Sequence, residues 1–175
     1  MRPEPWSDVR SWPALRTAGR EQVTLDASQR AAIARRLELE SLDSLTATIA
    51  HEPWLDGVRL RGRVEAAACR LCGVTLDPFL ESVEAEIDVK IVPEGSPNAP
   101  APEAELVVAL DAEDPPDIAP AAGIDLGAYI VEALGLGLDP FPRAPGAVFE
   151  FVDPKPEPSP FASLAALASK PPKED

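Results

Sequence analysis

The sequence predicts an α+β fold in which one antiparallel sheet of about four to six strands is covered by two helices. Several segments alternate apolar and polar residues with the period of two that half-buried strands require. Two other segments, near 27–38 and 125–136, repeat apolar residues every three to four positions, as amphipathic helices do. Hydrophobic residues make up 45% of the 175 residues, which is enough for one core.

The domain organisation follows from where proline and charge are concentrated. We expect one folded unit, a proline-containing arm before it, and a proline-rich tail that ends in a short apolar helix. Two acidic or proline-rich segments inside the unit are expected to be mobile loops. The arm covers residues 1–20, the α+β domain 21–152, the loops 93–104 and 111–123, and the tail 153–175.

The first elements are a strand at 21–25, a helix from 27 and a strand at 44–50. The first strand is rich in β-branched residues and alternates. Asp26 or Ser28 can cap the helix, because a short oxygen-bearing side chain accepts hydrogen bonds from free N–H groups at a helix start. The strand at 44–50 alternates apolar and polar residues and is followed by a turn at 51–57, which contains a proline and an Asp-Gly pair.

A central hairpin that carries the two cysteines is expected next. Residues 58–66 alternate and place arginines on one strand face, and residues 83–92 alternate with acids on the face opposite their apolar residues. If the two strands pair, the acids can neutralise the arginine row, which argues against a nucleic-acid site. The arginines are Arg59, Arg61 and Arg63, and the acids are Glu84, Glu86 and Asp88.

The later part of the chain predicts a short strand and a helix. Residues 106–110 form an apolar run that is typical of a strand. Leu126, Ile130 and Leu134 recur every four residues, and Asp125 precedes them as a helix cap. The proline-rich segment after residue 138 ends this helix, because proline cannot continue it.

Both ends of the chain carry apolar side chains that suit docking. Trp6 and Trp12 can anchor the arm on the core of the domain or on a partner. In the tail, Phe161, Leu164 and Leu167 share one face of the expected short helix. We interpret this face as a candidate docking segment, with docking on the chain's own domain or disorder as the alternatives.

Charge is distributed unevenly. The net charge is −14, yet residues 1–63 carry ten arginines against nine acids. An acidic chain repels a phosphate backbone on average, so any RNA contact must use a local basic patch. Besides the arginine row, the candidates are Arg30, Arg35 and Arg36 of the first helix, and the alternative is a solvated helix face.

Cys69 and Cys72 have the spacing of half a zinc site. A structural zinc needs four ligands, and the only other strong ligand in the chain is His51. We therefore expect neither zinc nor another cofactor, and we interpret the cysteines as small apolar residues near a turn. A redox pair is the alternative, although the strand–helix context of such pairs is missing.

The sequence also argues against catalysis and against a membrane span. A single histidine leaves few general bases, and no nucleotide-binding or nucleophile motif appears. No small-molecule substrate is evident. Apolar runs are too short to cross a bilayer, and the first residues do not resemble a secretion signal. We expect a cytoplasmic binding protein.

Three motifs follow one another in order along the chain. The first is the cysteine hairpin followed by VTLDPF, the second is the helix that leads into LDPFPR, and the third is PFASLAAL near the end. Together they resemble the YceD-like family, the bacterial proteins for accumulation of the large-subunit ribosomal RNA, and its alphaproteobacterial branch in particular. The resemblance covers roughly residues 20–170. Family members often carry a second cysteine pair after the helix, which this chain lacks.

The resemblance implies a non-enzymatic factor for synthesis, processing or stability of 23S ribosomal RNA and for large-subunit assembly. It implies ribosomal RNA, ribosomal proteins or assembly proteins as partners. It transfers no catalytic residue and no metal ligand. The acidic composition favours a protein partner, because acidic surfaces complement basic ribosomal proteins. The alternative function is an acidic chaperone or adaptor for a basic protein client.

Overall fold

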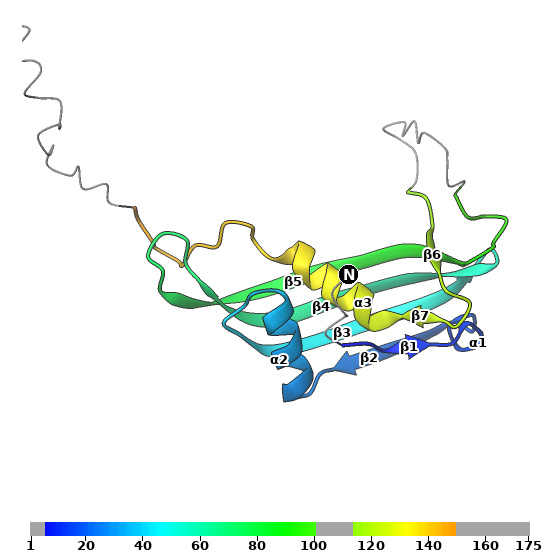
Figure 1. The fold of residues 1–175 in the computed structure, drawn as a ribbon, viewed down its shortest axis with the longest axis horizontal. Coiled ribbons are helices and arrows are strands. Elements are labelled where there is room, and N and C mark those ends of the chain that lie inside the picture. Colours follow the sequence, from blue (N-terminus) through cyan, green and yellow to red (C-terminus); the bar gives the residue numbers. More distant parts are fainter. Residues whose placement is uncertain (1–5, 101–113, 150–175) are drawn as a thin grey trace, which may run out of the picture.

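The computed structural model describes residues 6–100 and 114–149. They form an α+β fold built on a five-stranded sheet with the order β2-β3-β4-β5-β6 (Figure 1). The first four strands are antiparallel, and β6 runs parallel to β5. The strands are β2 (Gly19–Thr24), β3 (Ser41–Trp54), β4 (Gly57–Leu71), β5 (Pro78–Pro93) and β6 (Asp117–Ala119).

Two helices cover one face of this sheet (Figure 1). Helix α2 (Ala27–Arg36) packs on β3, and helix α3 (Leu126–Gly137) packs on β5 and β4. The short helix α1 (Trp12–Leu15) and the paired strands β1 (Val9–Arg10) and β7 (Ile124–Asp125) complete the described part. Within it, no helix combines the length and apolar character needed to cross a bilayer.

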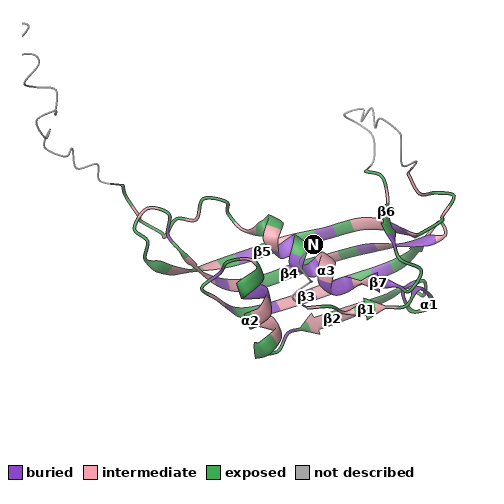
Figure 2. Cartoon of the chain, in the orientation of Figure 1, coloured by how far each residue is buried: buried purple, intermediate pink, exposed green. Residues whose placement is uncertain are grey.

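The core lies between the helices and the sheet (Figure 2). Val58, Leu60 and Val64 of β4 are fully buried because the alternation of a strand points every second side chain to the helices. Ile130 and Leu134 of α3 belong to the same core cluster and are also fully buried. The opposite face of the sheet carries polar and charged side chains.

Local hydrogen bonds position both helices. Asp26 and Gln29 form a capping box at the start of α2: the Asp26 carboxylate accepts from the Gln29 N–H, and the Gln29 side chain accepts from the Asp26 N–H. The backbone donor of Gln29 lowers the pKa of Asp26. Asp125 caps α3 by accepting from the Gly127 N–H at 2.9 Å.

The α+β class, the two helices and the long hairpin are confirmed, but some boundaries differ from the prediction. Strand β3 continues through most of the expected turn at 51–57. The reversal needs only Leu55 and Asp56, and Leu55 has a positive φ of 51°. In a hairpin with a two-residue turn, the residue pair that flanks the turn is hydrogen-bonded across the strands, and the next pair along is not. Pro53 occupies that pair, and its nitrogen faces the side where β2 has already ended, so its missing N–H costs nothing.

One expectation about the edge of the sheet was wrong. The segment 111–123, expected as a loop, contains β6, and β6 makes the sheet mixed because it runs parallel to β5. For the arm, the prediction that it anchors on the core of the domain is confirmed at Trp12, which is buried there and whose indole donates to the Pro120 carbonyl. The expected strand at 106–110 and the tail helix with Phe161, Leu164 and Leu167 lie outside the described residues.

Gly57 is a position at which the fold tolerates no side chain. A Cβ atom there would lie 1.9 Å from the carbonyl oxygen of Ile91, which belongs to the backbone of β5. We expect Gly57→Ala to lower the free energy of unfolding by about 1–3 kcal/mol, as overpacking does. Thermal unfolding of the purified chain measures this.

Gly135 provides the matched control. A Cβ at Gly135 would meet its nearest atom, of Leu37, at the ordinary contact distance of 3.5 Å. Because alanine favours a helix interior over glycine, Gly135→Ala should keep or raise the melting temperature. Equal melting temperatures for the wild type and Gly57→Ala would contradict the packing argument.

Candidate functional site

The arginine row lies on the face of β4 that the helices leave open. Arg59 donates from Nε and Nη2 to the two carboxylate oxygens of Asp88, at 2.7 and 2.8 Å. Arg61 Nε lies 3.7 Å from Asp88 Oδ2, and Arg61 Nη1 lies 3.6 Å from Glu52 Oε1. The side-chain hydrogen bond from Arg59 is the largest cause that holds the pKa of Asp88 below its ordinary value.

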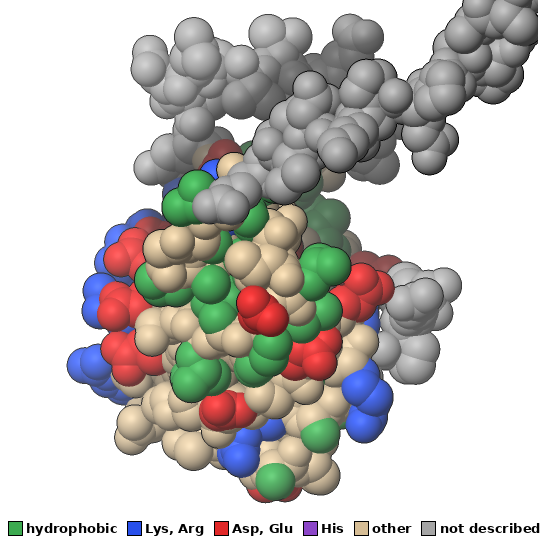
Figure 3. Space-filling model, turned by 90° about the vertical axis from the view of Figure 1, so that its left-hand side faces the viewer, with side chains coloured by type: hydrophobic (Ala, Val, Ile, Leu, Met, Phe, Trp, Pro, Cys, Tyr) green, Lys and Arg blue, Asp and Glu red, His purple; other side chains and the backbone are tan. Residues whose placement is uncertain are grey.

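Arg63 completes the pattern, because its Nη1 lies 3.4 Å from a carboxylate oxygen of Glu84. The predicted hairpin is thus confirmed, and every arginine of the row lies within 4 Å of a carboxylate. Of the three acids expected to neutralise the row, Glu84 and Asp88 do so, whereas Glu86 forms no ion pair with another described residue. Basic and acidic side chains also lie next to one another along one side of the space-filling view (Figure 3). This surface offers little net positive charge to a phosphate backbone.

The helix arginines do not extend the row. Arg30 donates to the backbone carbonyls of Leu25 and Leu42, at 2.7 and 3.1 Å, and thereby ties α2 to the sheet. Arg35 and Arg36 are exposed in the last turn of α2, which covers the other face of the sheet. The six predicted arginines therefore form no single basic patch.

The two cysteines lie at the connection between β4 and β5. Cys69 is half-buried, whereas Cys72 is fully buried. The Cys72 sulfur accepts backbone N–H bonds from Val74 and Ala144, both at 3.4 Å. The Ala144 N–H is the largest cause that lowers the pKa of the Cys72 thiol to about 7. No cluster of three potential metal ligands occurs among the described residues.

Apolar side chains are gathered at this end of the molecule (Figure 3). The connection between β4 and β5 is joined to the segment after α3 by the Ala144 bond and by a hydrogen bond from the Gly73 N–H to the Pro142 carbonyl, at 2.8 Å. Large exposed hydrophobic residues of the two segments are Leu71, Leu76, Phe141, Val148 and Phe149.

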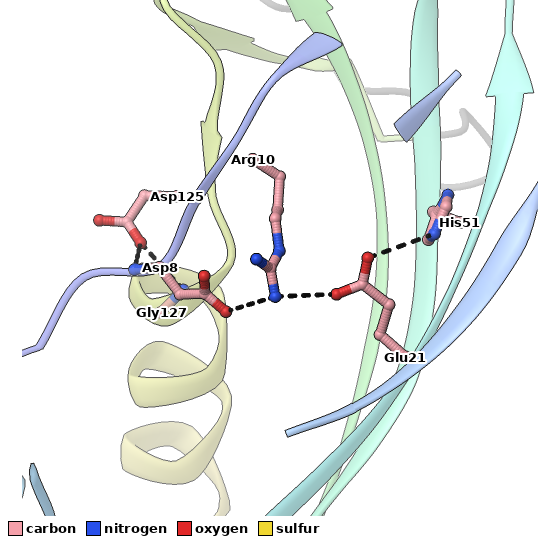
Figure 4. A network of polar contacts seen from close by, with 6 residues as sticks. All are labelled: Asp8, Arg10, Glu21, His51, Asp125 and Gly127. Atoms are coloured by element: carbon pink, nitrogen blue, oxygen red, sulfur yellow. Dashed lines mark hydrogen bonds and ion pairs between the residues drawn. The ribbon is translucent and has the colours of Figure 1, made fainter. Parts of the chain in front are cut away.

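A polar network surrounds the only histidine (Figure 4). His51 is buried, and its Nδ1 lies 3.1 Å from the Leu15 carbonyl oxygen. Because a carbonyl only accepts, Nδ1 carries the proton. The Nε2 lies 3.8 Å from Glu21, whose other oxygen pairs with Arg10 at 3.0 Å. These contacts hold the arm against β2 and β3.

The same network reaches the start of α3 (Figure 4). Arg10 pairs with Asp8 at 3.2 Å, and the Asp8 N–H donates to Asp125 at 2.8 Å. Asp125 also caps α3, and the Leu126 N–H donates to the Asp8 carbonyl at 3.0 Å. We interpret the network as a brace between arm, sheet and helix.

A groove of about 610 Å³ lies beside the outer edge of β5 and the flank of α3, and we call it the edge groove. Five acids and two basic residues line it. Tyr129 donates to Asp117 at 3.1 Å, and burial is the main cause that raises the pKa of Tyr129 above its ordinary value. The lining residues are Arg59, Glu86, Ile87, Asp88, Val89, Lys90, Asp114, Pro115, Asp117, Tyr129, Glu132, Ala133 and Leu136.

Sequence reasoning missed this groove. Its acids come from three separate segments, and the pairing of β6 with β5 and the packing of α3 on β5 bring them together. The one signal in the sequence was the surplus of acid after residue 63. Comparisons with known protein families, with curated proteins and with solved structures found no match for this chain.

The Cys72 thiol gives a testable pH dependence. Its pKa is lowered from 9.0 to about 7 by hydrogen bonds that favour the thiolate. The stabilisation is therefore complete above the unfolded pKa and is lost as the pH falls through about 7. We expect the difference in melting temperature between the wild type and Cys72→Ala to be larger at pH 9.0 than at about pH 6.

The thiolate itself is followed by its ultraviolet absorbance during a pH titration. The wild type should show a transition near pH 7 that Cys72→Ala lacks and Cys69→Ala retains. A single transition near pH 9.0 in the wild type would contradict the role of the N–H donors.

Proposed function

We propose that this chain is a non-enzymatic factor that supports 23S ribosomal RNA and large-subunit assembly by binding a basic protein partner. The proposal of a protein partner rests on one observation, namely which charged side chains form ion pairs and which do not. The arginine row is matched to carboxylates, whereas Glu86, Asp114 and Glu132 in the edge groove form no ion pair with another described residue. The ribosomal setting rests on the resemblance to the YceD-like family.

Electrostatics favours protein over RNA as the direct ligand. RNA binding draws its affinity from basic groups that release counterions when they meet phosphates. Here the arginines of the row already neutralise acids, and separating them from those acids would cost part of the gain. A basic protein instead meets a complementary field, which steers association.

The contacts of the titratable groups support a binding role. His51, Glu21 and Arg10 are engaged in the brace that joins the arm to the sheet. Asp125 is engaged as a helix cap. We therefore propose a cytoplasmic docking protein that carries out no chemistry.

A chaperone or adaptor for a basic client outside the ribosome is the second candidate. The acidic edge groove favours it equally, since charge complementarity does not identify the client. The two candidates differ in their effect on ribosomal RNA, which only the first one requires.

A strain that lacks this chain tests the ribosomal setting. We expect the ratio of large-subunit to small-subunit ribosomal RNA to fall, because large-subunit assembly lacks a factor. Electrophoretic profiling of total RNA measures the ratio. A normal ratio, together with retained binding of a basic client, would favour the adaptor.

Complementation separates the two surfaces. A variant with Arg61 and Arg63 both changed to Ala should restore the RNA ratio, because both side chains already lie beside carboxylates and neither lines the edge groove. A variant with Glu86→Gln, Asp114→Asn and Glu132→Gln should not restore it. The opposite pattern would show that the arginine row, and hence RNA, is the functional contact.

A further inference from the structure

We propose that the free edge of β5, at residues 79–90, binds an extended peptide segment bearing lysine or arginine by strand addition within the edge groove. This inference rests on the proposed function, since it names the mode in which a basic protein partner binds. The partner supplies one strand, and β5 supplies the hydrogen-bonding edge.

The edge is open along most of its length. One side of β5 pairs with β4 along nearly its whole length: Pro78 lies opposite Leu71 at one end, and Ile91 lies opposite Val58 at the other. On its other side, β6 pairs only with residues 91–93. Within the described chain, every second residue of 79–90 therefore presents its backbone N–H and C=O to no strand. Such an edge is a template for another strand.

The surroundings of the edge have the shape that an added strand needs. An added strand would lie about 4.8 Å from β5, and the edge groove provides this space beside residues 86–90. Tyr129, Glu132 and Leu136 on the flank of α3 form one wall, and Pro115 and Asp117 lie near the end at which β6 begins. Leu136 is 81% exposed, so it offers an apolar contact to the incoming chain.

The charges of the groove select a basic strand. Of its two basic residues, Arg59 binds Asp88 and Lys90 lies over the ring of Trp54, at 5.3 Å from its centre. Glu86, Asp114 and Glu132 form no ion pair with another described residue. An incoming Lys or Arg would meet these acids across the strand or across the groove, and opposite charges in such pairs are favourable.

The same charges argue against other occupants. A second copy of β5 would place Glu84, Glu86 and Asp88 against their own counterparts, which is repulsive. RNA is repelled for the same reason. The chain's own apolar run at 106–110 is flanked by Glu105 and Asp111, so it brings no positive charge to the groove.

A synthetic peptide tests the proposal on the full chain. The probe is a capped peptide of alternating lysine and valine, and its affinity is measured by calorimetry. A second peptide carries N-methyl groups on the amides that would face β5, which leaves its charge unchanged. We expect the methylated peptide to bind at least about tenfold more weakly, because it loses several backbone hydrogen bonds. Backbone amide shifts by nuclear magnetic resonance should locate the unmethylated peptide at residues 79–90.

Charge variants provide the matched control. The combination Glu86→Gln, Asp114→Asn and Glu132→Gln should weaken binding about tenfold and reduce its salt dependence. The combination Glu38→Gln, Glu40→Gln and Asp43→Asn removes the same charge near the start of β3 and should leave the affinity unchanged. Equal weakening by both combinations would mean that net charge alone attracts the peptide, which overturns the proposed site.

Three further outcomes would also overturn strand addition, and they leave the proposed function separately testable. Equal affinity of the methylated peptide would show that no backbone ladder forms. Binding only after residues 106–110 are replaced by Gly and Ser would show that the chain's own segment occupies the edge. Failure of the peptide to bind, while a strain lacking the chain still loses large-subunit RNA, would refute this inference alone.

Discussion

The structure depends on one constraint: the helices cover a single face of the sheet, so every strand must place its apolar side chains on that face. Strand β4 shows this alternation most strictly, because it is paired with β3 on one side and with β5 on the other along its length. Val58, Leu60 and Val64 face the helices, and the residues between them face the open side. The arginine row is a consequence of this alternation, and the pairing of β5 brings acids to it.

The same constraint explains which parts of the molecule could be predicted. Alternation and helical periodicity are local, so the hairpin, α2 and α3 followed from the sequence. The pairing of Arg59 and Arg63 with acids of the neighbouring strand followed once the hairpin was assumed. The strand β6 did not, because three residues between prolines carry too little pattern, and its partner is a strand distant in sequence.

The edge groove could not be predicted because it depends on how far the other described elements cover the edge of β5. Whether an edge is free is decided by the length of β6 and the position of α3, and neither is encoded near residues 79–90. His51 is similar: its sequence context indicates a turn, but its buried position arises from Leu15 of the folded arm and Glu21 of β2. Features of this kind form only when segments that are distant in sequence meet.

The contact between Asp8 and Asp125 has a consequence for the order of events during protein synthesis. The two residues are 117 positions apart, yet Asp8, which directly precedes β1, and the cap of α3 share this bond. The ribosome therefore releases the arm long before its docking site exists, and the earliest residues wait while nearly the whole domain is translated. Until α3 emerges, the nascent chain exposes the apolar face of its sheet to the crowded surroundings of the exit tunnel.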